Sequence, residues 1–168
     1  MNEDKKEARV LVIGVGNDFR GDDAVGLAVA RRLEQQAVDG IAVVEAPGEG
    51  ASLIDVWEGT DAVILIDAVR SGSVPGTIHR LSRRALTRSA DLFLHSTHAI
   101  SVSDAIELAR AMKRLPRRLI VVGIEGEDFR AGLGLSQEVK AAVSSAVDTV
   151  LEEARAMMRP SRVLSHHA

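Results

Sequence analysis

Apolar and polar positions alternate along the chain in blocks that predict strands and helices in turn. Near-continuous runs of Val, Ile, Leu and Ala are typical of strands buried on both faces. We expect such strands at residues 9–15, 41–45, 61–67 and 119–124. Apolar residues at helical spacing predict helices at about 22–36, 52–57, 103–112 and 136–158. This alternation is typical of an α/β fold, a three-layer α/β/α sandwich around a mostly parallel sheet.

One segment departs from the parallel pattern. The turn-forming run 71–76 is followed by residues 77–81, in which Ile78 and Leu81 are the apolar members. Too few residues separate this strand from the one at 61–67 for a helical crossover, so we expect the two to form an antiparallel pair. The predicted sheet therefore has about five strands, one of them antiparallel.

Composition narrows the class of protein. The chain has 168 residues, of which 46% are hydrophobic, and a net charge of -3. We expect one domain, 1–168, with an ordered core at about 9–158 and a flexible tail at 160–168. The charge gives no basic footprint for nucleic acid, no apolar run is long enough to span a membrane, and no signal peptide is evident. We expect a cytoplasmic protein that binds neither nucleic acid nor membrane.

The first loop contains glycines that invite comparison with nucleotide-binding motifs. Gly14 and Gly16 would begin a dinucleotide fingerprint, but Phe19 stands where the third Gly is required. A phosphate-binding loop would need Lys and Ser or Thr where Asp22 and Asp23 stand, and carboxylates repel a polyphosphate. We therefore expect no nucleotide cofactor. With no cysteine in the chain, disulfides and thiolate metal sites are excluded as well.

Three candidate metal ligands follow predicted strands or lie in loops near them: Asp23, Asp67 and His98. The carboxyl ends of parallel strands line one crevice, so these side chains could meet there. Asp67 closes the apolar run 62–66, and a buried carboxylate is costly unless it is paired or coordinates a metal. Two carboxylates and an imidazole suit nickel or zinc and leave positions open for water or substrate.

Each of these residues also has a structural interpretation. For Asp22 we prefer the role of helix N-cap, whereas Asp23, in the first helical turn, is the better ligand candidate. Asp67 could instead accept hydrogen bonds from backbone amides of the next turn. His98 could be an ordinary solvated histidine, and His95 competes with it for the role of ligand.

Two further features carry weaker signals. Ser101 and Ser103 lie outside any Gly-x-Ser-x-Gly motif, so serine catalysis has little support. Basic residues gather in two clusters, which we interpret as solvated faces beside the sheet, with a docking patch for an acidic partner as the alternative. These clusters are Arg80, Arg83, Arg84 and Arg88, and Lys113, Arg114, Arg117 and Arg118.

Several short motifs occur in one order along almost the whole chain, from about residue 9 to 157. They are Gly-Val-Gly-Asn at 14–17, the acidic pair at 22–23, Ile-Asp-Ala at 66–68, Ser-Thr-His at 96–98 with Asp104, Gly-Ile-Glu at 123–125, and Gly-Leu-Gly-Leu-Ser at 132–136. In this order and spacing the chain resembles the maturation endopeptidases of nickel–iron hydrogenases. Some members have Glu where Asp23 stands, and Glu125-Gly126 replaces a more usual Gln-Pro.

The resemblance implies an α/β sandwich and a nickel-dependent peptidase. Such enzymes remove a C-terminal extension from the hydrogenase large-subunit precursor after nickel insertion, and the nickel in the precursor is the recognition element. The family's metal ligands, which are also the expected catalytic residues, correspond to Asp23, Asp67 and His98. The resemblance thus favours His98 over His95, and we prefer Asp67 as general base.

The remaining predictions concern the substrate and the rival functions. We expect Gly48 and Gly50 to let a substrate backbone approach, and Asn17 either to cap the first loop or to bind substrate. One rival is a non-enzymatic module that binds nickel or a partner with the same three ligands. Another is a small-molecule hydrolase on the same fold, which would act without a protein partner.

Overall fold

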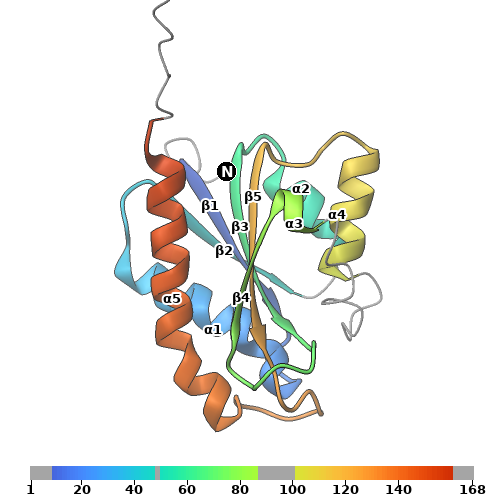
Figure 1. Cartoon of the computed structure of the whole chain (residues 1–168), viewed down its shortest axis with the longest axis vertical. Coiled ribbons are helices and arrows are strands. Elements are labelled where there is room, and N and C mark those ends of the chain that lie inside the picture. The colour runs from blue at the N-terminus through green and yellow to red at the C-terminus, as the bar shows by residue number, and fades with distance from the viewer. Residues whose placement is uncertain (1–8, 48–49, 87–100, 161–168) are drawn as a thin grey trace, which may run out of the picture.

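The computed structural model describes residues 9–47, 50–86 and 101–160, which form a mixed sheet covered by helices on both faces (Figure 1). The sheet has five strands in the order β2-β1-β3-β5-β4, and only β4 runs antiparallel. The strands are β1 (Val10–Gly16), β2 (Ile41–Pro47), β3 (Ala62–Val69), β4 (Ile78–Ser82) and β5 (Arg118–Glu125). The predicted fold class is confirmed.

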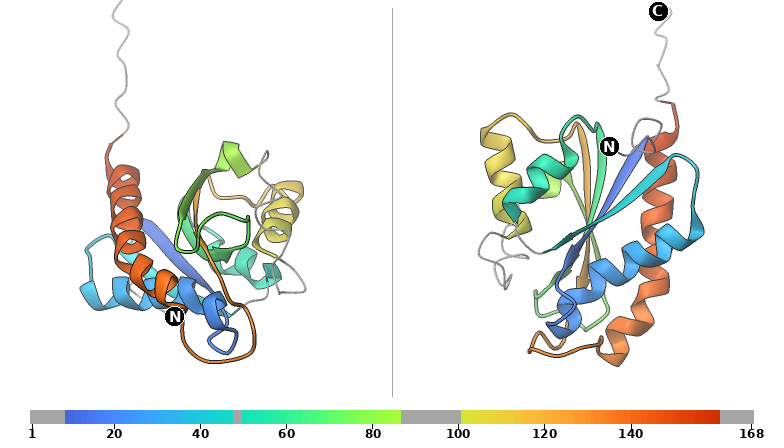
Figure 2. Two further views of the ribbon diagram at one scale, coloured as in Figure 1. Left: turned by 60° about the horizontal axis from the view of Figure 1, so that its bottom comes forward. Right: turned by 180° about the vertical axis from the view of Figure 1, so that it is seen from behind.

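The helices form two layers. The long helices α1 and α5 cover one face of the sheet, and α2 and α4 cover the other, as the two views of Figure 2 show. A single 3-10 turn, η2, leads into α1. The bounds are η2 (Gly21–Ala24), α1 (Val25–Gln36), α2 (Gly50–Trp57), α3 (Arg83–Leu86), α4 (Val102–Ala111) and α5 (Gln137–Met158).

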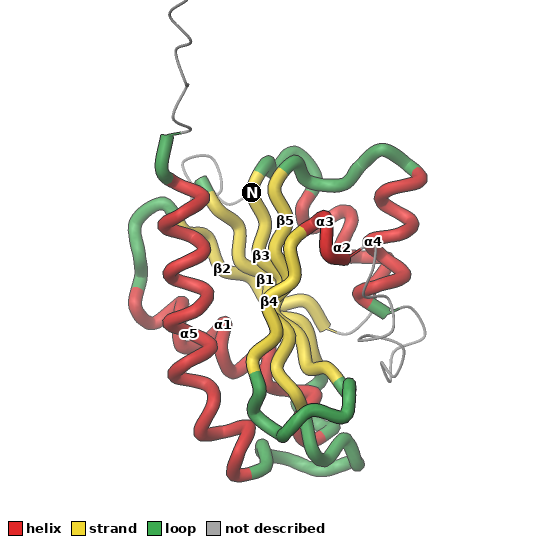
Figure 3. The backbone as a smooth tube through the Cα atoms, in the orientation of Figure 1, coloured by secondary structure: helices red, strands yellow, loops and turns green. Residues whose placement is uncertain are grey.

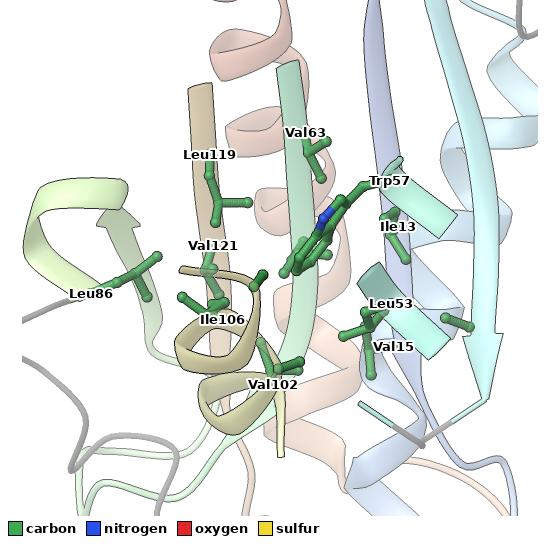
Figure 4. Packing of buried hydrophobic residues seen from close by; sticks show 14 of the residues in the cluster. Ile13, Val15, Leu53, Trp57, Val63, Leu86, Val102, Ile106, Leu119 and Val121 are labelled. Carbon is green, nitrogen blue, oxygen red and sulfur yellow. The ribbon is translucent and has the colours of Figure 1, made fainter. Parts of the chain in front are cut away.

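The central strands are apolar on both faces because each face is buried under helices. In β3, Leu65 and Val69 belong to the core that α2 and α4 cover, whereas Ile64 and Ile66 belong to the core under α1 and α5. Figure 4 shows the first of these cores, with the indole of Trp57 set against the sheet. The continuous Val, Ile and Leu runs of the sequence follow from this double burial.

Two details of the sheet differ from the sequence prediction. Asp67 does not close its strand, because β3 continues to Val69. The edge strand β4 is antiparallel as expected, but it pairs with β5 and not with β3. The reason is that β5 pairs with β3 along the whole of 62–69 and so occupies the place between β3 and β4.

Two glycines let α1 lie unusually close to the ends of β1 and β3. A Cβ on Gly26 would stand 2.2 Å from the carbonyl oxygen of Val15 and 2.4 Å from that of Ile66. A Cβ on Gly14 would stand 2.4 Å from the carbonyl oxygen of Gly26. Close packing of α1 thus explains why a glycine stands at position 14, which lies within β1. None of the helices in the described part of the chain is long and apolar enough to cross a membrane.

Candidate active site

Every buried acidic residue in the described ranges lies at the carboxyl edge of the sheet, where β1, β3 and β5 end. Figure 3 shows the loops that follow these strands gathered at the lower end of the sheet. The four acids are Asp22, Asp23, Asp67 and Glu125, with exposed fractions of 0%, 4%, 2% and 1%. A buried carboxylate is costly without strong compensation, so four at one edge require an explanation.

Asp23 and Asp67, two of the predicted ligands, are brought to neighbouring strand ends. A Cβ on Gly16, the last residue of β1, would stand 2.0 Å from the carbonyl oxygen of Asp23, so the backbone of Asp23 rests on that strand end. Gly26, three residues further on, lies against the carbonyl oxygen of Ile66, the neighbour of Asp67. The 3-10 turn and β3 are in contact. The backbones of Asp23 and Asp67 therefore lie in neighbouring segments at one corner of the sheet.

The third predicted ligand, His98, lies outside the described residues, as does its competitor His95. Helix α4 begins shortly after them, and Figure 4 shows Val102, in its first turn, at the same end of the core as Val15 of β1. Within 9–47, 50–86 and 101–160, no three His or acidic side chains are grouped closely enough to hold a metal ion. The described residues thus supply two of the three predicted ligands.

Asp104, the last member of the Ser-Thr-His motif, has a structural role. Its carboxylate accepts hydrogen bonds from the backbone N–H and the hydroxyl of Ser101, both at 2.9 Å, and its own N–H donates to the Ser101 hydroxyl at 3.1 Å. This capping box fixes the start of α4. The bonds from the backbone and then the hydroxyl of Ser101 lower the pKa of Asp104.

Asp22 is not the helix N-cap that we predicted. The residue before the 3-10 turn is Arg20, and no side chain caps the turn. Instead, Asp22 binds the loop between β5 and α5. Its Oδ1 accepts from the N–H of Ser136 at 2.7 Å, and its Oδ2 accepts from that hydroxyl at 2.8 Å and from the N–H groups of Glu127 and Asp128 at 2.8 and 2.9 Å. Asp22 therefore has a structural role: it joins the loop after β1 to the β5–α5 loop, more than a hundred residues away in sequence.

Glu125, at the end of β5, joins a third loop to this edge. Its carboxylate accepts hydrogen bonds from the N–H and hydroxyl of Ser71, at 2.8 and 2.7 Å, and from the N–H of Gly72 at 3.0 Å. The Nε2 of His79 lies 3.2 Å from it. Burial raises the pKa of Glu125, but the bonds from Ser71, Gly72 and His79 outweigh burial and leave the pKa below its ordinary value. Sequence reasoning missed this role, although an acid that ends an apolar strand was the signal used for Asp67.

The predicted substrate-binding residues have mixed outcomes. The Oδ1 of Asn17 accepts from the N–H of Phe19 at 2.9 Å, so the capping alternative for Asn17 is confirmed. Gly50 begins α2, and Gly48 lies outside the described residues. A role of these three residues in substrate binding stays a prediction.

The opposite, amino edge of the sheet carries a surface hollow and no buried acid among the described residues. The hollow is lined by Trp57, Glu58, Gly59, Thr60, Asp61, Arg114, Leu115, Pro116 and Arg117. Arg114 forms ion pairs there with Asp55 and Glu58, at 3.4 and 2.8 Å. Arg80, from the other basic cluster, pairs with Glu153. These two arginines have acidic partners within the chain, which favours solvated faces over a docking patch.

Comparison with known proteins agrees with the geometry. Residues 27–153 match the family model described as hydrogenase maturation protease, a range that begins after Asp23 and contains Asp67. The hydrogenase 2 maturation protease of Escherichia coli is 29% identical over 152 residues, which cover 88% of this chain and 91% of the relative. The hydrogenase expression/formation protein HupD of Thiocapsa roseopersicina is 25% identical, over 88% of this chain and 68% of the relative.

Solved structures give the same assignment. The hydrogenase maturating endopeptidase HybD from Escherichia coli superposes with a TM-score of 0.76 at 27% identity, covering 88% of this chain and 93% of that one. The [NiFe] hydrogenase maturation protease HybD from Thermococcus kodakarensis gives a TM-score of 0.72 at 29% identity, covering 87% and 99%. The chain therefore belongs to the hydrogenase maturation protease family and is an endopeptidase.

Proposed function

We propose that this enzyme removes the C-terminal extension of a nickel–iron hydrogenase large-subunit precursor after nickel insertion, and that it recognises the nickel already bound in the precursor. The observation that carries the proposal is the burial of Asp23 and Asp67 in two segments, η2 and β3, that contact each other at the carboxyl edge. The cytoplasm is the expected location. Nickel is part of the substrate in this proposal, not a resident cofactor.

The donor set fits the metal. Carboxylate oxygens and an imidazole are ligands that nickel accepts, and no thiolate is available from this chain. Asp23 approaches the corner from the turn that leads into α1, and Asp67 from the face of β3 that it shares with Leu65 and Val69. We propose His98 as the third contact, on the basis of the family resemblance. With these contacts the enzyme's side chains would bind directly to the nickel held in the precursor.

The first step of the proposed mechanism is to position the scissile bond beside the catalytic carboxylates. Contact with the nickel brings the scissile peptide bond beside the enzyme's carboxylates, so a bimolecular encounter becomes a reaction between oriented groups. Asp67 then accepts a proton from water as the water oxygen attacks the scissile carbonyl carbon. When the C–N bond breaks, the proton passes to the leaving amine. Nickel can act as a Lewis acid toward the carbonyl oxygen.

The direct test uses intact-mass analysis of a precursor incubated with catalytic amounts of the enzyme. A nickel-loaded precursor should lose a short C-terminal peptide over many turnovers, whereas a nickel-free precursor should keep its mass. Stoichiometric binding without any loss of mass would favour the non-enzymatic module. Cleavage of both precursors would retain the peptidase and reject nickel recognition.

A further inference from the structure

Three large apolar side chains stand in solvent on the loops at the carboxyl edge; Val74 lies on the loop bonded to Glu125, and Phe19 and Leu133 lie on two other loops. Phe19 is 70% exposed and Leu133 is 78% exposed. Their loops are bonded to each other through the backbone. The N–H of Gly132 donates to the carbonyl of Phe19 at 2.9 Å, and the N–H of Gly21 donates to the carbonyl of Gly132 at 3.1 Å. The two side chains thus come from paired segments 114 residues apart in sequence, and Figure 2 shows these segments side by side.

The exposure does not come from loosely attached loops. Asp22, fully buried, accepts four hydrogen bonds from the loop that carries Leu133, and its own N–H donates to the carbonyl of Asp128 at 2.8 Å. Asn17 holds the backbone of Phe19 from the other side. Because the backbones of these loops are already held in place, a partner that covers the side chains orders less of the chain on binding, which favours a binding contact.

The surroundings leave room for a partner. A Cβ placed on Gly132 or on Gly134 would meet no heavy atom within 4 Å, so open space flanks Leu133 on both sides. Phe19 lies four positions before Asp23, on the loop that delivers this carboxylate to the corner. A molecule that covered both apolar side chains would therefore lie directly beside the candidate site.

We propose that Phe19 and Leu133 form a docking contact for an apolar patch on the folded large-subunit precursor, next to the segment that is cleaved. This inference rests on the proposed function and adds to it a surface outside the reacting groups. The precursor is a better occupant than a second copy of this chain, because a second copy on these loops would cover the corner that holds Asp23 and Asp67. The contact anchors the substrate and takes no part in the chemical step.

The test compares three variants: Phe19→Ala, Leu133→Ala and the double variant. Leu108→Ala is a matched control, because Leu108 is also exposed (44%) but lies on α4, away from the paired loops. For nickel-loaded precursor, each single variant should raise KM several-fold, and the double variant by on the order of tenfold or more, as expected for apolar anchor residues. The control should keep the wild-type KM, and all variants should keep the wild-type Tm.

A binding measurement separates this proposal from the proposed function. The affinity of nickel-loaded precursor is measured by calorimetry in an Asp67→Asn background, where cleavage cannot interfere. A tenfold loss of affinity in the double variant supports docking, even if the wild-type enzyme turns out not to cleave. An unchanged affinity and KM would overturn docking while leaving cleavage intact. A wild-type dimer that the double variant converts to monomer, with unchanged KM, would also overturn it in favour of a second copy.

Discussion

Acidic residues are exposed and paired with arginine at one edge of the sheet but buried at the other. At the amino edge, Asp55 and Glu58 keep side chains that are 78% and 64% exposed and pair with Arg114. At the carboxyl edge, Asp23 and Asp67 are at most 4% exposed. Exposed ion pairs change the free energy of unfolding little, whereas a buried carboxylate destabilises the fold unless hydrogen bonds, ion pairs or a metal compensate it. This difference supports the proposal that substrate binds at the carboxyl edge, although the surface hollow lined by Trp57 and Arg114 lies at the other.

The carboxyl edge itself divides into two kinds of acid. Asp22 and Glu125 accept several hydrogen bonds from the loops around them, and these bonds explain why the residues are buried. Asp23 and Asp67 occupy the strand ends between those loops. The first pair is structural, and we propose from the family resemblance that Asp23 and Asp67 contact the substrate; the following substitutions test that proposal.

The largest effect is expected at Asp23. Asp23→Asn keeps the shape of the side chain but removes the charge that would contact nickel, so processing of nickel-loaded precursor should fall on the order of 100-fold or more. Asp23→Glu keeps the charge and should retain most activity. Initial rates at equal enzyme concentration measure both variants. If the Asn variant processes as fast as the Glu variant, Asp23 does not contact the metal.

Asp22 should affect folding more than chemistry. Asp22→Ala leaves buried donors of the β5–α5 loop without their acceptor, so the free energy of unfolding should fall by about 3 kcal/mol or more. Asp18→Ala removes an exposed ion pair with Arg31 and should cost about 1 kcal/mol or less. Urea unfolding of the two variants gives both numbers. Equal losses would contradict the role of Asp22 in joining the loops.

Gly26→Ala tests the close approach of α1 to the strand ends. Alanine normally stabilises a helix by about 1 kcal/mol relative to glycine. Here its Cβ would meet the carbonyl oxygens of Val15 and Ile66, so we expect a loss of about 2 kcal/mol instead. The shift should also move Asp23 away from Asp67 and reduce processing. A gain in Tm would show that α1 does not lie this close to the sheet.

The smallest effect concerns pH and Glu125. The pKa of Glu125 is lower in the folded protein than the ordinary value of 4.5, so its ionised form stabilises the fold above that value. The stabilisation is lost as the pH falls through the lowered pKa. Glu125→Gln should therefore cost about 1 kcal/mol at neutral pH and progressively less below about pH 4.5. A difference between wild type and variant that stays constant from pH 7 to 3 would contradict this.

Local pattern predicted every strand and every helix of the described residues except the short α3, but it did not predict the long-range partners of these elements. The Val and Ile runs of β3 and β5 predict strands buried on both faces, and the expected α/β/α layers follow from them. The pairing of β4 with β5 depends on where a later strand is placed, which no local pattern records. For the same reason Asp22 was taken for a helix cap, since its partners lie 105 to 114 residues away.

The candidate site shows the same limit. The position of Asp67 at the end of an apolar run marked it as a buried carboxylate, and burial is confirmed. The same reasoning applies to Glu125, but its neighbours, Ser71 and His79, come together only through the register of β4 on β5 and the loop before it. An acid at the end of an apolar run, such as Asp67 or Glu125, can be predicted to be buried. Three-dimensional contacts are needed to show which of them hold loops together.

The most direct test of the proposed site compares two acids near opposite ends of β3. Asp61 precedes the strand and is exposed, whereas Asp67 lies near its carboxyl end and is buried. Nickel-loaded precursor is incubated with wild type, Asp61→Asn or Asp67→Asn, and the loss of the C-terminal peptide is followed by intact mass. Asp61→Asn should process the precursor at the wild-type rate, and a folded Asp67→Asn should not process it. Processing at the wild-type rate by Asp67→Asn would contradict it.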